Sequence, residues 1–145
     1  MTDIDLSGML ADALAAGVYY VGSGSRATLV HAAHALDFAV FPIDLSGCGD
    51  RDAVLARLAT ALDLPDWFGG NWDALADCLN DLSWRPADGY LLLLDHAHDW
   101  QARDPAGFDT LLEIAAEAAD AWTRHGVPFW LLVIAQDGEI GALDG

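Results

Sequence analysis

Three aspartates recur at every fourth position in the stretch LPDWFGGNWDALADCLND, residues 64–81: Asp73, Asp77 and Asp81. In a helix this spacing places the three carboxylates in a row on one face. Each like-charged pair at this spacing costs roughly 0.2–0.5 kcal/mol. The row suits the binding of arginine and lysine side chains, because each carboxylate can accept a forked guanidinium hydrogen bond. An ordinary solvated helix face is the alternative interpretation.

Aromatic residues precede the row of carboxylates. Trp67 and Phe68 stand directly before the pair Gly69 and Gly70, and this glycine pair predicts a surface loop over residues 64–70. An aromatic anchor at the edge of a carboxylate patch is typical of a tight interface with a basic cleft. The loop and the row together therefore indicate a surface that binds a cationic partner.

A helix over residues 72–82 is expected to position the row. Asn71 has the side chain that favours an N-cap. The apolar residues of the helix fall on the side opposite the aspartates and are expected to face a core: Trp72, Leu75, Ala76 and Leu79. Asn80 lies beside the row, and Cys78 lies on its flank as a structural thiol.

Other groups of residues with reactive side chains give only weak support for an enzyme active site or a metal site. Asp73 and Asp77 could form an acid–base pair, but no lysine or metal-ligand pattern accompanies them. The segment DHAHDW, residues 95–100, contains metal-ligating residue types, yet it fits a turn or a helix start better. His31 and His34 lack a third ligand. We therefore expect no catalytic residue, no metal site and no cofactor.

Composition restricts the class of partner. The chain has 145 residues and a formal net charge of −17, which disfavours nucleic acid and anionic membranes and favours basic proteins. No secretory pattern or membrane-length apolar run is present, so a cytoplasmic protein with reduced thiols is expected. A disulfide between Cys48 and Cys78 is disfavoured in a reducing compartment, although their spacing alone does not exclude it.

Short apolar runs alternate with helical stretches, which predicts an α/β fold with a small parallel sheet packed by helices. Strands are expected over residues 38–45, 89–95 and 127–135, with a fourth over 18–23, and helices over 26–36, 50–62, 72–82 and 108–125. Pro42 is unusual inside a strand, because it cannot donate a ladder hydrogen bond. The predicted organisation is an N-terminal extension, a central domain and a tail: residues 1–37, 38–135 and 136–145.

The stretch LPDWFGGNWDALADCL resembles the core motif of the barstar family, intracellular protein inhibitors of microbial ribonucleases of the barnase type. The resemblance covers roughly residues 40–133 and follows the family's order of strands and helices. It implies that the loop and the following helix plug a ribonuclease active site, with carboxylates in place of substrate phosphates.

The resemblance also implies roles for individual residues. Trp67 would lie over the catalytic cleft, Gly69 would approach the enzyme, and Asn71 would open the helix. Asp73 would be the first interfacial carboxylate and Asp77 the central one. Three further residues would form the rim of this surface: Phe68, Asn80 and Asp81.

The chain departs from the family pattern at several positions. Trp67 replaces a tyrosine, Gly70 replaces an acidic residue, and Ala76 replaces a large aromatic. The family's further acid on the C-terminal helix has no firm counterpart, although Glu117 and Asp120 lie near the expected position.

The function expected from these observations is inhibition of a basic ribonuclease by a monomer or in a one-to-one complex. The first alternative is an acidic immunity or adaptor protein that binds a cationic toxin of another kind, or a different protein. The second alternative is a metal-dependent enzyme that uses the aspartates and residues 95–100.

Overall fold

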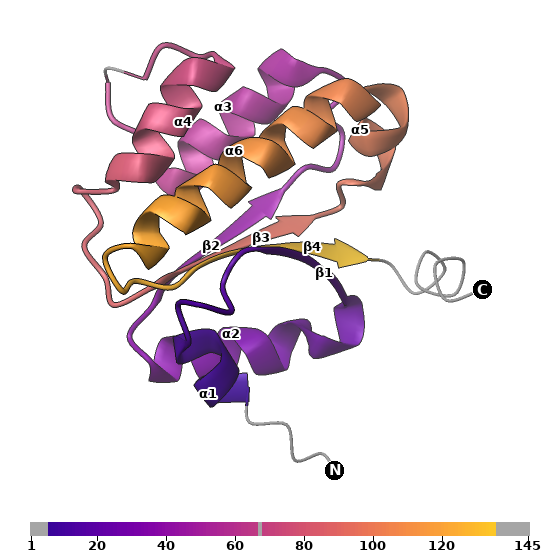
Figure 1. Ribbon diagram of the computed structural model, residues 1–145. Coiled ribbons are helices and arrows are strands. Elements are labelled where there is room, and N and C mark those ends of the chain that lie inside the picture. The colour runs from indigo at the N-terminus through magenta and orange to yellow at the C-terminus, as the bar shows by residue number, and fades with distance from the viewer. Residues whose placement is uncertain (1–5, 67, 136–145) are drawn as a thin grey trace.

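A four-stranded, fully parallel sheet forms the centre of the molecule (Figure 1). The computed structural model describes residues 6–66 and 68–135 of the chain. The strands are β1 (Val18–Gly22), β2 (Ala39–Asp44), β3 (Tyr90–Asp95) and β4 (Phe129–Ala135), and their order in the sheet is β1-β4-β3-β2. The predicted α/β class and the predicted fourth strand are confirmed.

Helices cover both faces of the sheet (Figure 1). One face carries α1 (Leu6–Ala11) and α2 (Arg26–Ala35), with a short 3-10 turn, η1 (Ser23–Ser25), before α2. The opposite face carries α3 (Arg51–Leu62), α4 (Trp72–Asp81), α5 (His98–Arg103) and α6 (Pro105–Thr123). No helix within the described ranges combines the length and the apolar character needed to cross a membrane.

Two helices differ from the sequence-based expectation. The first, α1, was not predicted. The second, α6, begins at Pro105 rather than near residue 108, because the Asp104 carboxylate accepts a hydrogen bond from Gly107 N (3.0 Å) and proline is favoured in the first turn. The predicted turn or helix start at residues 95–100 is confirmed, since α5 begins at His98.

The central strands are apolar on both faces because each face meets its own layer of helices. In β3, Leu92 and Leu94 belong to the main core under α3–α6, whereas Leu91 and Leu93 belong to a second core under α1 and α2. This arrangement accounts for continuous apolar runs in place of an alternating pattern.

Pro42 fits in β2 because β2 is an edge strand. Ala39 N donates to Gly89 O (2.9 Å) and Leu45 N donates to Asp95 O (2.9 Å), so alternate residues from Ala39 onward point their backbone groups at β3. Pro42 lies between these positions and turns its missing N–H toward the outside of the sheet. A proline is tolerated at such a position, since no ladder hydrogen bond is lost.

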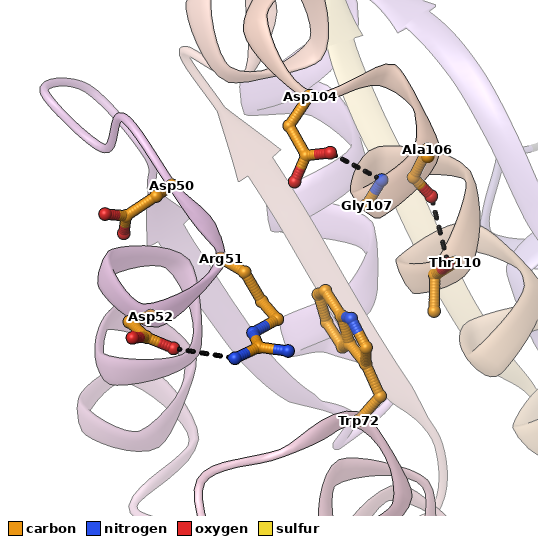
Figure 2. A pocket seen from close by; sticks show the side chains of 8 residues that line it. All are labelled: Asp50, Arg51, Asp52, Trp72, Asp104, Ala106, Gly107 and Thr110. Carbon is orange, nitrogen blue, oxygen red and sulfur yellow. Dashed lines mark hydrogen bonds and ion pairs between the residues drawn. The ribbon is translucent and has the colours of Figure 1, made fainter.

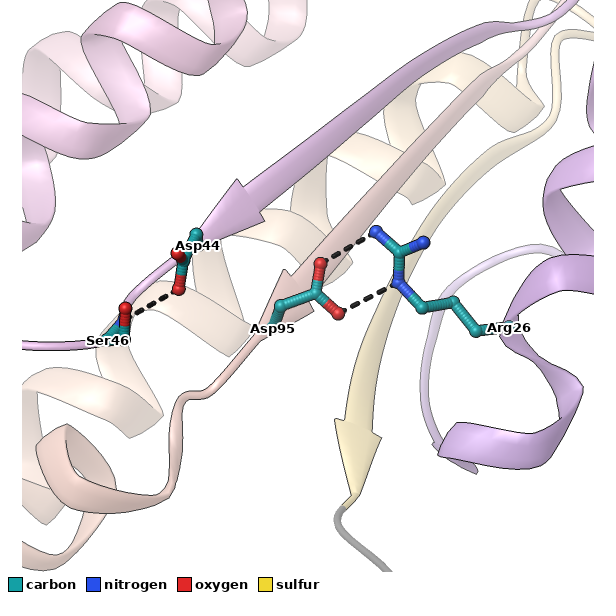
Figure 3. Close-up of polar contacts among 4 residues, drawn as sticks. All are labelled: Arg26, Asp44, Ser46 and Asp95. Atoms are coloured by element: carbon teal, nitrogen blue, oxygen red, sulfur yellow. Dashed lines mark hydrogen bonds and ion pairs between the residues drawn. The ribbon is translucent and has the colours of Figure 1, made fainter.

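An ion pair joins the start of α2 to the end of β3 (Figure 3). Arg26 Nε donates to Asp95 Oδ1 (2.9 Å) and Arg26 Nη2 donates to Asp95 Oδ2 (2.7 Å). Hydrogen bonding to Asp95 raises the pKa of Arg26. Nearby, the Asp44 carboxylate accepts from Ser46 N (2.9 Å), and this hydrogen bond lowers the pKa of Asp44.

We expect Arg26→Ala to lower the free energy of unfolding by about 1–2 kcal/mol, because Asp95 would lose both charged hydrogen bonds while staying mostly covered. The Asp95 side chain is 17% exposed. Urea denaturation would measure the change. Arg51→Ala is the matched control, because its ion pair with Asp52 is exposed and should contribute at most about 0.5 kcal/mol. Equal losses for the two variants would contradict this role for the Arg26–Asp95 pair.

Candidate partner-binding surface

The predicted Asn71 cap is present at the start of α4. The side-chain oxygen of Asn71 accepts a hydrogen bond from Ala74 N (2.8 Å), and its backbone is extended, as an N-cap requires. The helix ends at Asp81, and Leu82 follows in a left-handed conformation (φ 49°). The cap satisfies a backbone donor that would otherwise have no partner, so it sets the point at which the chain turns from loop to helix.

One face of α4 is fixed to the main body of the protein. Leu75, Cys78 and Leu79 are buried, and Trp122 Nε1 on α6 donates a hydrogen bond to the Leu79 carbonyl (2.8 Å). Trp72 is half-buried, with its ring centroid 6.4 Å from that of Trp100. The buried face holds the helix in one orientation, so its opposite face is presented rigidly.

The two cysteines are both free and buried, and they form no disulfide. Cys78 is more deeply enclosed than its expected place on the flank of α4 suggested. Burial raises the pKa of the Cys78 thiol, and the charges of Asp77 and Asp81 act in the same direction. Burial also raises the pKa of Cys48. Both thiols therefore act as packing groups rather than nucleophiles.

The carboxylates of α4 lie on its outer face. Asp73, Asp77 and Asp81 are all exposed. Asp81 accepts a hydrogen bond from Ser83 Oγ (3.1 Å). Within the described part of the chain, Asp73 and Asp77 have no side-chain hydrogen bond and no ion pair, and the arginine pairs formed there involve other acids. Two unneutralised carboxylates thus stand one helical turn apart on a fixed helix.

The other polar residues considered for this surface are also exposed. Asn80 Nδ2 donates to the Ala76 carbonyl (2.7 Å), which keeps its side chain along the helix. On α6, Glu117 is exposed and Asp120 pairs with Arg124 (3.2 Å), so Asp120 is partly neutralised within the protein.

The loop before α4 is partly anchored in the core. Phe68 is half-buried against the main core, and its N–H donates to the Pro65 carbonyl (2.9 Å). Gly69 and Gly70 are exposed, and Gly70 adopts φ 72°, a conformation that disfavours other residues. Trp67, the predicted anchor, lies outside the described residues.

An open cavity of about 530 Å³ lies where the N-termini of α3, α4 and α6 meet (Figure 2). Three acidic residues line it together with the Trp72 ring: Asp50, Asp52 and Asp104. Asp50 and Asp104 cap their own helices, and Asp52 pairs with Arg51 (3.3 Å). A smaller cavity of about 220 Å³ separates α3 from Phe68 and Gly70.

No local sequence pattern places these α3 and α6 acids beside the start of α4. Asp50 and Asp104 can be recognised as possible N-caps, because each is an Asp residue before a helix. Long-range packing brings these acids together beside Trp72. Elsewhere, His31, His34, His96 and His98 are exposed. Among the residues the structure describes, no group of three or more His, Cys, Asp or Glu side chains is arranged to hold a metal ion.

Comparison with known proteins identifies the family of this chain. No curated protein matches the chain. A family model described as "Barstar (barnase inhibitor)" matches residues 38–134, a range that includes the loop, α4 and three of the four strands and leaves β1 and α2 outside. Because this match spans well over half of the chain, the protein belongs to the barstar family.

Proposed function

We propose that this protein inhibits a basic ribonuclease by occluding its active site with residues 64–70 and α4. The observation that carries the proposal is the pair of exposed carboxylates, Asp73 and Asp77, which have no partner within the described part of the chain. An enzyme that binds RNA phosphates presents arginine and lysine side chains in its cleft. The two carboxylates offer those side chains an alternative anion at a fixed spacing.

Preorganisation supports this role. The Asn71 cap and the buried face of α4 hold the carboxylates before a partner arrives, so little conformational entropy is lost on binding. Asp73 and Asp77 provide the central charges, while Trp67 and Gly69 bring the loop against the partner. Asn71 holds the turn between loop and helix, and Phe68, Asn80 and Asp81 form the rim.

The direct test is an RNA-cleavage assay with a purified barnase-type ribonuclease. Equimolar protein should abolish cleavage, and the titration should end at one inhibitor per enzyme. The double variant Asp73→Asn, Asp77→Asn should need a large excess to reach the same inhibition. Full cleavage in the presence of excess wild-type protein would contradict the proposal.

The net charge of −17 should accelerate capture of a cationic enzyme. We expect the association rate constant to fall by about tenfold or more as sodium chloride rises from low concentration to well above physiological levels, because salt screens long-range attraction. Stopped-flow mixing with the ribonuclease would measure the rate constant. An association rate that does not change with salt would contradict electrostatic steering.

A second candidate function is an acidic immunity or adaptor protein that binds a cationic toxin other than a ribonuclease. The departures at Gly70 and Ala76 favour it, since the family pattern has an acid and a large aromatic at these positions. Gly70 also has the left-handed backbone that a side chain would strain. This candidate predicts tight, salt-sensitive binding to a cationic toxin whose activity is not RNA cleavage.

A further inference from the structure

The two edges of the sheet differ in how they are protected. At the β2 edge the outward backbone positions include Pro42, which has no N–H, and Asp44, which is exposed and charged. Proline and charge are common devices that prevent an edge strand from pairing with another chain. At the opposite edge, β1 has the sequence VYYVG, with neither a proline nor a charged residue.

The N–H and C=O groups of alternate β1 residues point away from the sheet. Leu131 N donates to Gly17 O (3.0 Å), so Gly17, Tyr19 and Val21 direct their backbone groups at β4. The alternate residues, Val18, Tyr20 and Gly22, therefore direct theirs outward. Tyr20 is the central residue of the five-residue strand. Among the described residues, no strand pairs with this outer edge.

The side chains along this edge are apolar or aromatic and accessible. Tyr19 and Tyr20 are 45% and 49% exposed. On the α2 face of the sheet, Tyr19 lines an apolar groove of about 320 Å³ together with Met9, Leu29 and Trp130. Aromatic residues of this kind are enriched at protein interfaces.

Charge also distinguishes this face from the rest of the protein. Apart from histidines, the charged residues within positions 6–36 are one acid, Asp12, and one base, Arg26. The net charge of −17 is therefore carried by other parts of the chain. Two copies of so acidic a protein repel each other, and the low charge of positions 6–36 lessens that repulsion for an association through this segment.

We propose that two copies of this chain associate through β1, in antiparallel register about a two-fold axis at Tyr20, to form a continuous eight-stranded sheet. In this register Tyr20 exchanges both backbone hydrogen bonds with its own copy, and Val18 pairs with Gly22 of the second copy. The outward groups at positions 18, 20 and 22 match this pattern. Tyr19 then faces Val21 of the second copy on the α2 face.

The pairing leaves the candidate partner-binding surface accessible. The groove and Tyr19 lie on the face of the sheet covered by α1 and α2. On the opposite face, α6 is the helix that contacts β1, and α4 lies beside α6 rather than over the β1 edge (Figure 1). Each copy of the dimer can therefore bind its own partner. The proposed dimer does not depend on ribonuclease inhibition, and it is an alternative to the monomer expected from the sequence.

Sedimentation equilibrium of the full chain tests the proposal. Wild-type protein should be dimeric, and Tyr20→Lys should be monomeric because it places two like charges at the two-fold axis. Tyr20→Pro should also be monomeric, since it removes the outward N–H in the way that Pro42 does in β2. The matched control is Leu14→Lys, which adds the same charge at an 87% exposed position outside β1 and should leave the dimer intact.

Salt gives an independent readout. Dimerisation should strengthen as salt rises, because two chains of charge −17 repel each other less when screened. Circular dichroism would confirm that the variants remain folded. A wild-type chain that is monomeric up to its solubility limit would overturn the proposal, and so would a dimer that both Tyr20 variants leave unchanged.

Discussion

Asp77→Asn is expected to weaken binding to a basic ribonuclease by about 30-fold or more, equivalent to roughly 2 kcal/mol or more. Asp77 is exposed at the middle of the carboxylate row and has no internal partner among the described residues. The substitution keeps the shape of the side chain and removes its charge, so a cationic group of the enzyme would be buried in the complex without its counter-ion. Titration calorimetry or inhibition constants would measure the loss.

Asp63→Asn is the matched control for Asp77→Asn. Asp63 is exposed at the end of α3 with φ 53°, a conformation that asparagine tolerates and alanine does not favour. Both substitutions remove one negative charge, so each should slow association slightly through weaker long-range steering. Only Asp77→Asn should greatly increase the dissociation rate. Similar losses of affinity for the two variants would contradict the position of the surface, even if inhibition itself were observed.

Asp77→Asn should make the folded protein more stable, although it weakens binding. It removes the repulsion of Asp77 from Asp73 and from Asp81, and the unfolding free energy should rise by roughly 0.4–1 kcal/mol for these two pairs. A solvated face with no partner would have no reason to retain this repulsion. A variant that is more stable but binds less tightly is therefore the expected signature of a row of carboxylates kept for binding.

Leu75→Ala, on the opposite face of α4, is expected to lower the unfolding free energy by about 2–5 kcal/mol. Leu75 is completely buried in the main core, so the truncated side chain would leave a cavity that its neighbours fill only in part. The melting temperature should fall by roughly 5–15 °C for a chain of this size. Differential scanning calorimetry would measure both quantities.

Leu14→Ala is the control for Leu75→Ala, because Leu14 is 87% exposed and should contribute little to stability. At a temperature where Leu75→Ala is still folded, its affinity for the ribonuclease should stay within a few-fold of the wild type, since the outer carboxylates are unchanged. A large loss of affinity in the folded variant would mean that the outer face depends on the exact packing of Leu75.

Much of the fold could be predicted because its signals are local. β3 and β4 are short apolar runs that can only be buried on both sides, and Asn71 marks the start of α4 within one residue. The start of α6 was misplaced because the apolar periodicity begins at Phe108, whereas the helix begins at its Asp104 cap and Pro105. α1 is a short helix, and its six residues are too few for helical periodicity to be recognised.

The candidate surface was predictable in its central part and not in its surroundings. Asp73 and Asp77 share a face of one helix, so their spacing alone places them together. Asp52 and Asp104 are brought near Trp72 by three separate helices, and no local pattern contains that information. The site roles of Gly69, Asn71, Asp73 and Asp77 stay predictions until a complex is measured.

The segment from Val18 to Ala35 covers apolar surface of the part of the chain that matches the family model. β1 occupies the free edge of β4, and α2 lies over Trp130, Leu132 and Ile134. A chain that began at residue 38 would expose both the edge of β4 and the apolar face under α2. An exposed apolar edge beside an exposed apolar face promotes aggregation. An excised central domain would therefore be a poor reagent, and recombinant work should retain the N-terminal segment.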